Sequence, residues 1–358
     1  MDLTCFSRDY AEAREKFLEI CHQRRLTVES HNHPMQGRDN EQLALDVAFS
    51  GPRDATNLLV ISSGCHGVEG FCGSAIQIDR LRDGDWNERC RRDNLAVLYL
   101  HALNPYGFSW LRRVNEDNVD LNRNFVDFGQ PLADNPDYRA VAPWLMRPGL
   151  LSDLRLVGYA LRHGRKSLQA AISRGQHSDP HGLFFAGARP TWSNLTLRRV
   201  LREHARQCRR IAWIDVHTGL GPQGVGERIY KGRQRAEDIA RARHWWGEQV
   251  TNSAEGNSVS ARLNGTLDQM VMSECAQAQY NGLTLEYGTL PGRKVLSALR
   301  AEQWLQNHPN TAPAVHQRIK ERLRGAFYPQ RDGWKREVLD QAREVLDQAL
   351  AGLASPLG

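Results

Sequence analysis

The amino-acid sequence predicts an α/β protein with three layers, in which helices cover both faces of a mixed, largely parallel central sheet. Three observations support this prediction: four short apolar segments that stop at polar residues, helical patterns between these segments, and one region of alternating apolar and polar residues. Strands that alternate with helices along a chain are typical of a parallel sheet sandwiched between helices.

The first elements expected along the chain are a helix and a hairpin. Residues 9–25 carry apolar side chains at helical spacing, which predicts an amphipathic helix that covers the sheet. Residues 26–49 alternate on either side of the turn-rich stretch HNHPMQGRDN. We therefore expect an antiparallel hairpin at one edge of the sheet.

Four apolar segments predict the central strands. They are Asn57–Ser62, Leu95–Leu100, Arg210–Val216 and Gly282–Leu285. Helical patterns at residues 71–82, 195–207 and 235–252 separate them. This order of strands and helices favours parallel pairing within the sheet.

A single catalytic domain is expected to span residues 1–358, with two distinctive segments. Residues 126–190 are rich in Pro, Gly and Asp at both ends, and we interpret them as an insertion or lid with a helix pair at 143–174. Residues 294–350 are periodic and rich in Arg, Glu and Gln, which predicts a helical C-terminal tail.

Composition excludes several classes of protein. The chain has 358 residues, of which 41% are hydrophobic and 25% charged, so it is neither disordered nor collagen-like. Its apolar runs are far shorter than the ~20 residues that a membrane-spanning helix needs. The N-terminal segment mixes charges with apolar residues and lacks the apolar core of a secretory signal. We therefore expect a cytoplasmic protein with no membrane partner.

The formal charge of +6 comes mostly from arginine, but the arginines are interleaved with acidic residues. No basic stripe studded with aromatic residues is present, so we do not expect nucleic acid as a partner. The seven cysteines show no CxxC spacing, which favours reduced thiols over disulfides or a thiolate zinc site. The sequence leaves the oligomeric state open, a homo-oligomer included.

Ionisable side chains follow the ends of the predicted strands. In open α/β sheets, ligands bind outside the carboxyl ends of the strands, so these residues are the first candidates for a site. The segments LLVISSGCHGVEG, RRVNEDNVDLNRNF, IAWIDVHTG and GLTLEYGT supply His66 and Glu69, then Arg113, Asn122 and Arg123, then His217, and last Glu286.

His66, Glu69 and His217 form a candidate metal site. Two imidazoles and one carboxylate leave the fourth tetrahedral position open, which is typical of catalytic zinc rather than structural zinc. The glycines around His66 allow the sharp turn that would bring His66 and Glu69 onto one cation. Imidazole and carboxylate ligands accept several divalent ions, so the ligand types alone do not select zinc.

The ordered motifs HxxE, RxNxxxVDLNRNF, DVHTG and LEYG resemble those of the zinc carboxypeptidase superfamily. This superfamily includes carboxypeptidase A and the succinylglutamate desuccinylase/aspartoacylase branch, and the chain more closely resembles an uncharacterised bacterial metallopeptidase-like group within it. The motifs lie between residues 57 and 290. The resemblance implies one zinc ion, with His66, Glu69 and His217 as its ligands.

The resemblance also implies roles for five further residues. Glu286 matches the glutamate that acts on the nucleophilic water, and Arg113 matches the arginine that polarises the scissile carbonyl. Asn122 and Arg123 match the pair that grips a free substrate carboxylate. Asp120 matches a carboxylate that orients the first zinc histidine through its other ring nitrogen.

We therefore expect a zinc-dependent hydrolase that cleaves an amide bond next to a free carboxylate. An arginine fork binds carboxylates in a planar, bidentate manner, which favours a peptide C-terminus or an N-acyl amino acid as substrate. A carboxypeptidase-like metallopeptidase is the first hypothesis, and an N-acyl amino acid deacylase is the alternative. A hypothesis of another class is a non-catalytic protein that binds an anionic partner.

Several details stay open in the sequence. Arg112 competes with Arg113, Arg123 could instead pair with Asp120 or Asp127, and Asp215 either supports His217 or hydrogen-bonds in the core. Carboxypeptidases of the family carry a mobile tyrosine some twenty residues before the catalytic glutamate, and this chain has none at 261–268. Three other tyrosines are candidates to replace it: Tyr230, Tyr280 and Tyr287.

Overall fold

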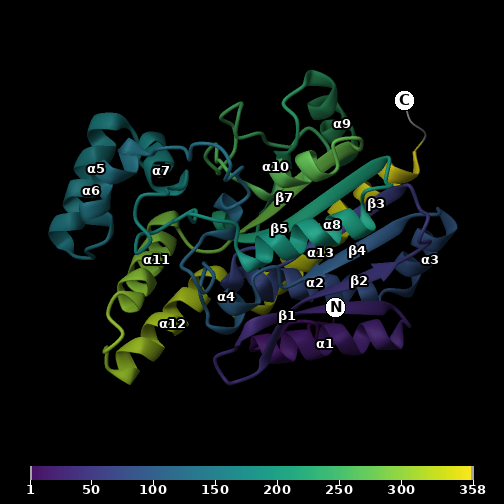
Figure 1. Cartoon of the computed structure of the whole chain (residues 1–358), viewed down its shortest axis with the longest axis horizontal. Helices are drawn as coiled ribbons and strands as arrows, with labels where there is room; N and C mark the ends of the chain where they lie inside the picture. The colour runs from purple at the N-terminus through teal and green to yellow at the C-terminus, as the bar shows by residue number, and fades with distance from the viewer. Residues whose placement is uncertain (1, 356–358) are drawn as a thin grey trace.

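In the computed structural model, which describes residues 2–355, a seven-stranded mixed sheet runs through the centre of the molecule (Figure 1). The strand order is β1-β2-β4-β3-β5-β7-β6. The strands are β1 (Thr27–Gln36), β2 (Gln42–Ser50), β3 (Asn57–Ser62), β4 (Ala96–His101), β5 (Arg210–Gln223), β6 (Gly226–Lys231) and β7 (Gln279–Gly288). Parallel pairs join β4, β3, β5 and β7, and antiparallel pairs join β1, β2 and β6 to them. This arrangement confirms the mixed, largely parallel sheet.

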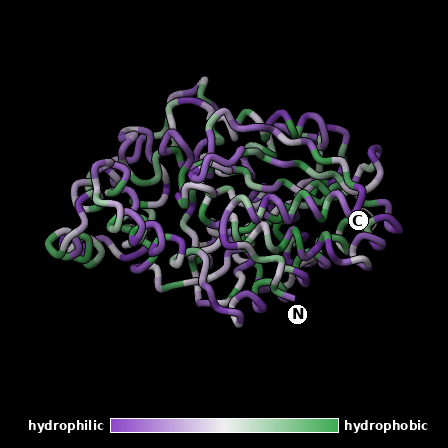
Figure 2. Tube along the Cα trace, turned by 90° about the horizontal axis from the view of Figure 1, so that it is seen from below, coloured by the Kyte–Doolittle hydropathy of each residue, from purple (hydrophilic) through white to green (hydrophobic). Residues whose placement is uncertain are grey.

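Helices cover both faces of the sheet, which confirms the three layers. On one face lie α1 (Tyr10–Gln23), α2 (Gly70–Arg82), α3 (Gly84–Arg92), α9 (Ala236–Trp246) and α13 (Asp332–Ala354). On the other face lie α8 (Trp192–His204) and α10 (Leu267–Glu274). Successive side chains of β3 point to opposite faces of the sheet. Leu59 and Ile61 pack against the first group of helices, and Leu58 and Val60 pack against the second. Accordingly, many hydrophobic residues, green in Figure 2, lie in the interior between the helix layers.

A third group of helices lies at the carboxyl ends of the strands, at the left of Figure 1. It consists of α5 (Pro136–Leu145), α6 (Leu150–His163), α7 (Arg165–Ser173), α11 (Gly292–Gln306) and α12 (Pro313–Phe327). These helices share their own hydrophobic cluster. The short elements η1 (Gly67–Glu69), α4 (Pro105–Ser109) and η2 (Leu121–Arg123) lie between this group and the sheet.

The structure confirms the first helix, the edge hairpin and the four central strands, and it corrects several boundaries. β1 runs through Gln36, into the stretch expected as a turn, and β5 continues to Gln223 instead of ending at Val216. The helix predicted over 235–252 ends at Trp246, because Gly247 adopts a left-handed φ of 89°. The helix pair predicted at 143–174 is a set of three helices, α5 to α7. The helical tail is confirmed as α11 to α13.

The sequence analysis missed β6, α3 and α10. β6 reads GERIYK, a short run without a clear apolar alternation, and it pairs with β7 as the edge strand of the sheet. All seven cysteines are buried and free, in agreement with the expected reduced thiols. Across residues 2–355, no helix combines the length and hydrophobicity that a membrane crossing requires.

Candidate metal centre and active site

His66 and Glu69 lie on the tight turn that follows β3. This turn is fixed by two backbone hydrogen bonds, in which Gly67 N donates to Arg113 O at 3.1 Å and Val68 N donates to Arg112 O at 2.8 Å. A Cβ atom on Gly67 would lie 2.0 Å from the backbone of Gly107, so only glycine allows this approach. The close contact places the His66–Glu69 turn directly beside Arg113.

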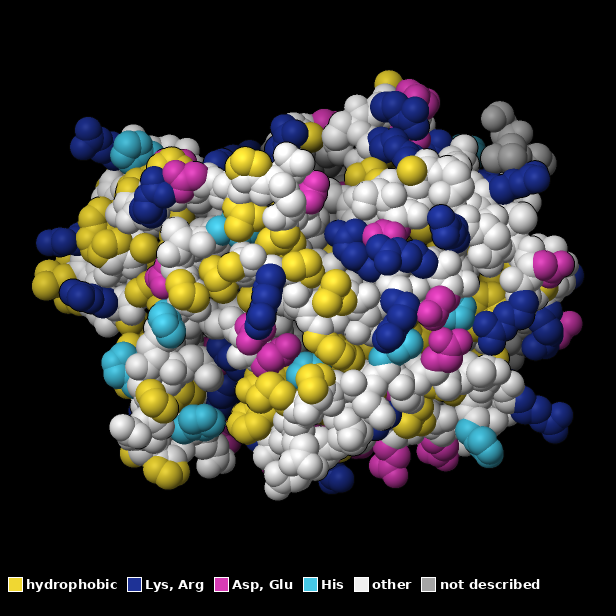
Figure 3. Space-filling view, in the orientation of Figure 1, with side chains coloured by type: hydrophobic (Ala, Val, Ile, Leu, Met, Phe, Trp, Pro, Cys, Tyr) yellow, Lys and Arg dark blue, Asp and Glu magenta, His cyan; other side chains and the backbone are white. Residues whose placement is uncertain are grey.

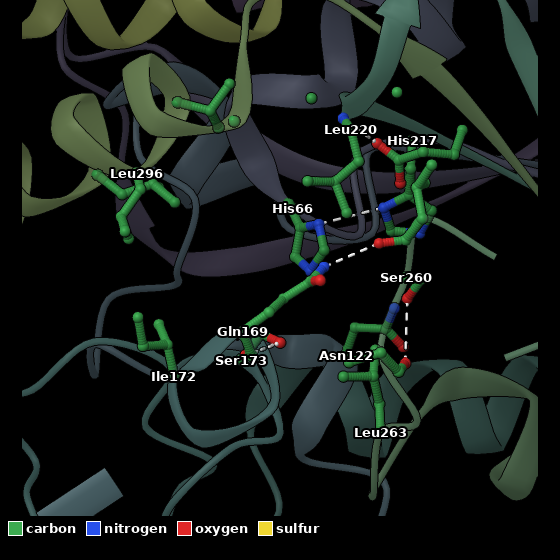
Figure 4. Close-up of a pocket in the computed structure, with 18 of the residues that line it drawn as sticks. His66, Asn122, Gln169, Ile172, Ser173, His217, Leu220, Ser260, Leu263 and Leu296 are labelled. Carbon is green, nitrogen blue, oxygen red and sulfur yellow. Dashed lines mark hydrogen bonds between the residues drawn. The ribbon is translucent and has the colours of Figure 1, made fainter. Parts of the chain in front are cut away.

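The three predicted metal ligands converge on one point. His66 Nδ1 lies 2.9 Å from Glu69 Oε1, His217 Nδ1 lies 2.9 Å from Glu69 Oε2, and the two Nδ1 atoms are 3.1 Å apart. All three residues are buried. Zinc at about 2.0–2.1 Å from each donor of a tetrahedron would separate the donors by roughly 3.3 Å, so this triangle is close to the required size. In Figure 4 the Nδ1 atoms of the two histidine rings point toward one another, and the ring planes meet at 63°.

The outer nitrogens of both histidines contact carboxylates. His217 Nε2 lies 2.6 Å from Asp215 Oδ2, and His66 Nε2 lies 3.2 Å from Asp120 Oδ1. Because ionised carboxylates only accept hydrogen bonds, the contact with Asp215 favours the proton on Nε2 of His217 and the free lone pair on its Nδ1, which faces Glu69. His66 Nε2 faces both the acceptor Asp120 Oδ1 and the donor Arg113 Nη2, while its Nδ1 faces Glu69. The residues therefore fit a divalent metal ion such as zinc. Asp215, which the sequence left open, supports His217 and also accepts a hydrogen bond from Ser62 Oγ at 2.6 Å.

Arg113 lies against this group of donors. Its Nη1 donates to Glu69 Oε1 at 3.2 Å, its Nε donates to Asp120 Oδ2 at 3.0 Å, and its Nη2 lies 2.8 Å from His66 Nε2. The guanidinium also lies 5.2 Å from the ring centre of Phe184. Burial alone would raise the pKa of Asp120, but the two arginines beside it, Arg113 and Arg123, hold that pKa well below its usual range. The structure thus brings Asp120 and Arg113 to the predicted site.

Glu286 lies on β7, directly beside His217 on β5, because the two residues are paired in the parallel register. Its Oε1 accepts a hydrogen bond from Leu220 N at 3.0 Å. Burial and the nearby charge of Glu69 raise the pKa of Glu286 to about 7. Glu69 behaves differently: although burial by itself raises a carboxylate pKa, His66 and His217 lower that of Glu69. Two neighbouring carboxylates with opposite shifts are typical of acid–base sites.

Asn122 and Arg123 both line the site, but they differ in how many of their N–H donors are already hydrogen-bonded. Asn122 Oδ1 accepts a hydrogen bond from Leu267 N at 3.0 Å, which leaves its amide N–H groups available. Arg123 is buried, and its Nε and Nη2 both donate to the carbonyl oxygen of Ser173 at the end of α7, at 2.8 and 2.6 Å. Its Nη1 donates to the carbonyl of Asn122 at 2.7 Å and lies 3.9 Å from Asp120. Arg123 therefore anchors α7, with one N–H on each Nη left for a ligand.

A cavity of about 460 Å³ opens over the metal site. This volume lies within the ~300–1,000 Å³ range of small-molecule sites. One wall is apolar and comes from two helices, with Leu168 and Ile172 on α7 and Leu296 and Leu299 on α11. In Figure 4, Ile172 and Leu296 lie across the cavity from His217. Three further cations line the cavity: Arg165, Lys231 and Arg293.

The sequence analysis did not identify these wall residues. They belong to helices whose position cannot be deduced from local patterns, and no motif marks them. The one available signal was the segment 126–190, which was interpreted as an insertion or lid, and α7 of that segment lines the cavity.

Other residues that the sequence or the structure offers for the site are not suited to it. Arg112 is held by Glu302, with Nε to Oε1 at 3.0 Å, and does not line the cavity. Burial raises the pKa of the Cys65 thiol well above its usual value, which disfavours Cys65 as a thiolate ligand although it lies near Asp215 and His217. No tyrosine among residues 2–355 lines the cavity in this structure, so it places none of the three candidate tyrosines in the site: Tyr230, Tyr280 and Tyr287.

Comparison with known proteins places this geometry in a family. The fold is that of the zinc carboxypeptidases, as the resemblance implied. Bovine thrombin-activatable fibrinolysis inhibitor, solved in complex with tick carboxypeptidase inhibitor, has a TM-score of 0.52 and 12% identity, over 98% of this chain and 99% of that chain. The chain itself belongs to the family DUF2817, described as a protein of unknown function, which matches residues 6–341.

Two further matches have a lower TM-score or cover a smaller part of this chain. Carboxypeptidase A from Helicoverpa armigera has a TM-score of 0.47 and 12% identity, over 90% of this chain and 75% of that chain. Carboxypeptidase SOL1 from Arabidopsis thaliana is 36% identical over 77 residues, which make up 20% of this chain. The match spans only 14% of the length of that plant protein.

Proposed function

We propose that the protein is a zinc-dependent hydrolase that cleaves an amide bond next to a free carboxylate, in the manner of a carboxypeptidase. One observation carries this proposal: Nδ1 of His66, Nδ1 of His217 and the carboxylate of Glu69 meet within 2.9–3.1 Å, with Glu286 and Arg113 beside them in one cavity. A structural metal site would need neither an adjacent carboxylate with a raised pKa nor an open cavity.

The residues of the chain divide the reaction between them. When bound, zinc supplies Lewis-acid polarisation to an attacking water and to a carbonyl. Glu286 takes a proton from the water and returns it to the leaving nitrogen. Arg113 stabilises the negative charge that develops on the carbonyl oxygen.

The substrate carboxylate is assigned to Asn122 and Arg123. The amide N–H groups of Asn122 and the remaining N–H groups of Arg123 are the donors for this carboxylate at the cavity wall. A small peptide with a free C-terminus fits this arrangement. An N-acyl amino acid carries the same carboxylate, and its hydrolysis is the alternative reaction.

Metal analysis and a substrate panel test the proposal together. Purified protein should hold about one zinc per chain and lose its activity to chelators, and zinc should restore that activity. The panel compares peptides with free C-termini, the same peptides as C-terminal amides, and N-acyl amino acids. Cleavage of the free peptides supports a carboxypeptidase, and cleavage of N-acyl amino acids alone supports the deacylase. Metal and anion binding without turnover of any substrate would make the protein a non-catalytic binder and contradict the proposal.

A further inference from the structure

The floor of the cavity continues along strand β6, away from the metal ligands. Strands β6 and β7 are antiparallel, and their register pairs Ile229 with Thr284 and Lys231 with Gly282. Directly opposed residues share one face of a sheet, so all four lie on the face that carries Glu286. Ile229, Lys231 and Thr284 also line the cavity. Lys231 therefore stands at the far end of this floor, about 13 Å along the strand from Glu286.

The ammonium group of Lys231 has no counter-ion in the described part of the chain. The side chain is half-buried, and no carboxylate oxygen of those residues lies within 4.0 Å of its Nζ. Glu227, on the same face of β6, instead accepts hydrogen bonds from Thr251 Oγ1 at 2.6 Å and from Val259 N at 3.2 Å. Asp268 borders a second cavity together with Lys231 but forms no ion pair with it. The Lys231 ammonium is thus available to an anionic ligand in the cavity.

The charges that line the cavity are predominantly positive. Among the described residues of its lining, the acidic ones are Glu69 and Glu286, which belong to the metal site. Lys231 on the floor and two exposed arginines, Arg165 on α7 and Arg293 on α11, add three cations that no further acid in the lining balances. The outer surface differs, since in Figure 3 several Lys and Arg side chains lie beside Asp or Glu. A cavity with one sign of charge attracts ligands of the opposite sign.

The loop between α9 and α10 connects Lys231 with the residues assigned to the substrate carboxylate. Ala261 and Leu263 of this loop line the main cavity, and together with Lys231 they also line the second cavity, of about 280 Å³. At the end of the loop, Leu267 N donates to Asn122 Oδ1 at 3.0 Å. Asn122 and Lys231 therefore border one continuous space, with the apolar loop side chains between them.

We propose that the C-terminal residue of the substrate is itself acidic, with its main-chain carboxylate at Asn122 and Arg123 and its side-chain carboxylate at Lys231. This inference rests on the proposed hydrolase function and narrows the substrate to peptides that end in glutamate or aspartate. The extended side chains of a lysine and of an acidic residue can meet across the cavity floor. A neutral side chain in the same place would leave the ammonium without a partner in a partly desolvated space, which disfavours such peptides.

Peptides that differ only in their last residue test this assignment. The panel ends in glutamate, aspartate, glutamine, leucine or lysine, and each peptide is assayed with zinc-loaded protein. We expect kcat/KM for the two acidic peptides to exceed that for the glutamine peptide by about 10–100-fold, the usual range for a charge-assisted hydrogen bond. Equal values for the glutamate and glutamine peptides would overturn the inference and leave the hydrolase function intact.

Substitutions at Lys231 show whether this residue causes the preference. Lys231→Met removes the charge and keeps an unbranched apolar side chain, so the ratio between the glutamate and glutamine peptides should fall to about one. Lys231→Glu should reverse the preference toward the lysine peptide, a gain that a misfolded protein cannot produce. Lys294→Met is the matched control, because Lys294 is exposed on α11 and does not line the cavity, and its ratio should equal that of the wild type. A ratio that survives Lys231→Met would refute the role of Lys231.

Binding without turnover separates this inference from the proposed function. Zinc-loaded Glu286→Gln protein is titrated in a calorimeter with the glutamate and glutamine peptides, and the glutamate peptide should bind about 10–100-fold more tightly. Adding Lys231→Met to this protein should remove the difference. If the wild-type protein cleaves no peptide but the binding preference is present and depends on Lys231, the hydrolase proposal fails and the role of Lys231 stands. Equal binding of the two peptides refutes that role, whether or not any peptide is cleaved.

Discussion

His217 and Glu286 occupy paired positions on the neighbouring parallel strands β5 and β7. Paired residues of parallel strands place their side chains on the same face of a sheet. The sheet itself therefore fixes the distance between a candidate metal ligand and the proposed acid–base residue, with no loop between them. A site built on strands holds its geometry more closely than one built on loops.

Glu286→Gln should remove activity and keep the metal. The amide keeps the size of the side chain but cannot accept a proton, so kcat should fall by about 10²–10⁴-fold. Zinc content, measured by elemental analysis, should stay near that of the wild type because Glu286 is not among the three converging donors. Glu88→Gln, at an exposed glutamate on α3, is the control and should change neither quantity. A Glu286→Gln variant with near-normal turnover would remove Glu286 from the mechanism.

Glu286 should also make the metal-free protein less stable as pH rises. Its pKa is about 7 in the folded chain, above the usual 4.5, so between these values the folded state binds more protons than the unfolded state. Folding stability then falls as pH increases from about 5 to 7. Glu286→Gln should escape this loss and gain about 1–3 kcal/mol over the wild type between pH 5 and 8, with chelator present. Denaturant unfolding at several pH values measures the difference, and an equal pH dependence of the two proteins would contradict it.

The sequence predicted the donors well because each one directly follows a strand whose apolar run is easy to detect. His66, His217 and Glu286 lie within a few residues of these runs, and the parallel order of the strands brings their ends to one edge. Arg113 was a candidate because it follows a predicted strand, whereas its role, and Asp120 as a site residue, followed from the resemblance. The local sequence around them shows no strand or helix pattern that would have fixed their position.

The partners of Arg123 could be predicted only in part, since Asp120, one of the two expected acids, lies 3.9 Å from its Nη1. Its guanidinium binds the Ser173 carbonyl, 50 residues away and at the end of a helix in the segment 126–190. A backbone carbonyl leaves no mark in the sequence, whereas the candidate partners Asp120 and Asp127 were visible as acids. The apolar cavity wall could not be predicted for a similar reason, because Leu168 and Ile172 look in the sequence like ordinary core residues of an amphipathic helix.

Zinc binding should stabilise the folded chain, and this stabilisation should depend on His66, Glu69 and His217. Zinc at about 100 times its dissociation constant should raise the free energy of unfolding by about 2.7 kcal/mol. His217→Ala should lose this response because it removes one of three ligands, whereas His22→Ala, at an exposed histidine near the end of α1, should keep it. Thermal unfolding with and without zinc measures both effects. A full response in His217→Ala would place the metal elsewhere.

Gly67→Ala should damage the metal site through the backbone. The new Cβ would lie 2.0 Å from the backbone of Gly107, so the turn that carries His66 and Glu69 must move. We expect a loss of about 1–3 kcal/mol in folding stability and weaker zinc binding. Gly325→Ala is the control, because that helical glycine has nothing within 4 Å of an added Cβ and should become about 0.5–1 kcal/mol more stable. Normal zinc affinity in Gly67→Ala would show that the turn tolerates the shift.

Arg123→Lys should separate the two roles of Arg123. Lysine keeps the positive charge but lacks the fork that donates twice to the Ser173 carbonyl, so α7 should be held less firmly and stability should fall by about 1–2 kcal/mol. If Arg123 also binds the substrate carboxylate, KM should rise about tenfold for peptides with a free C-terminus. The residual activity on the same peptides as amides should change little. Steady-state kinetics on matched free and amidated peptides gives both values, and an equal effect on the two series would leave Arg123 with the anchoring role alone.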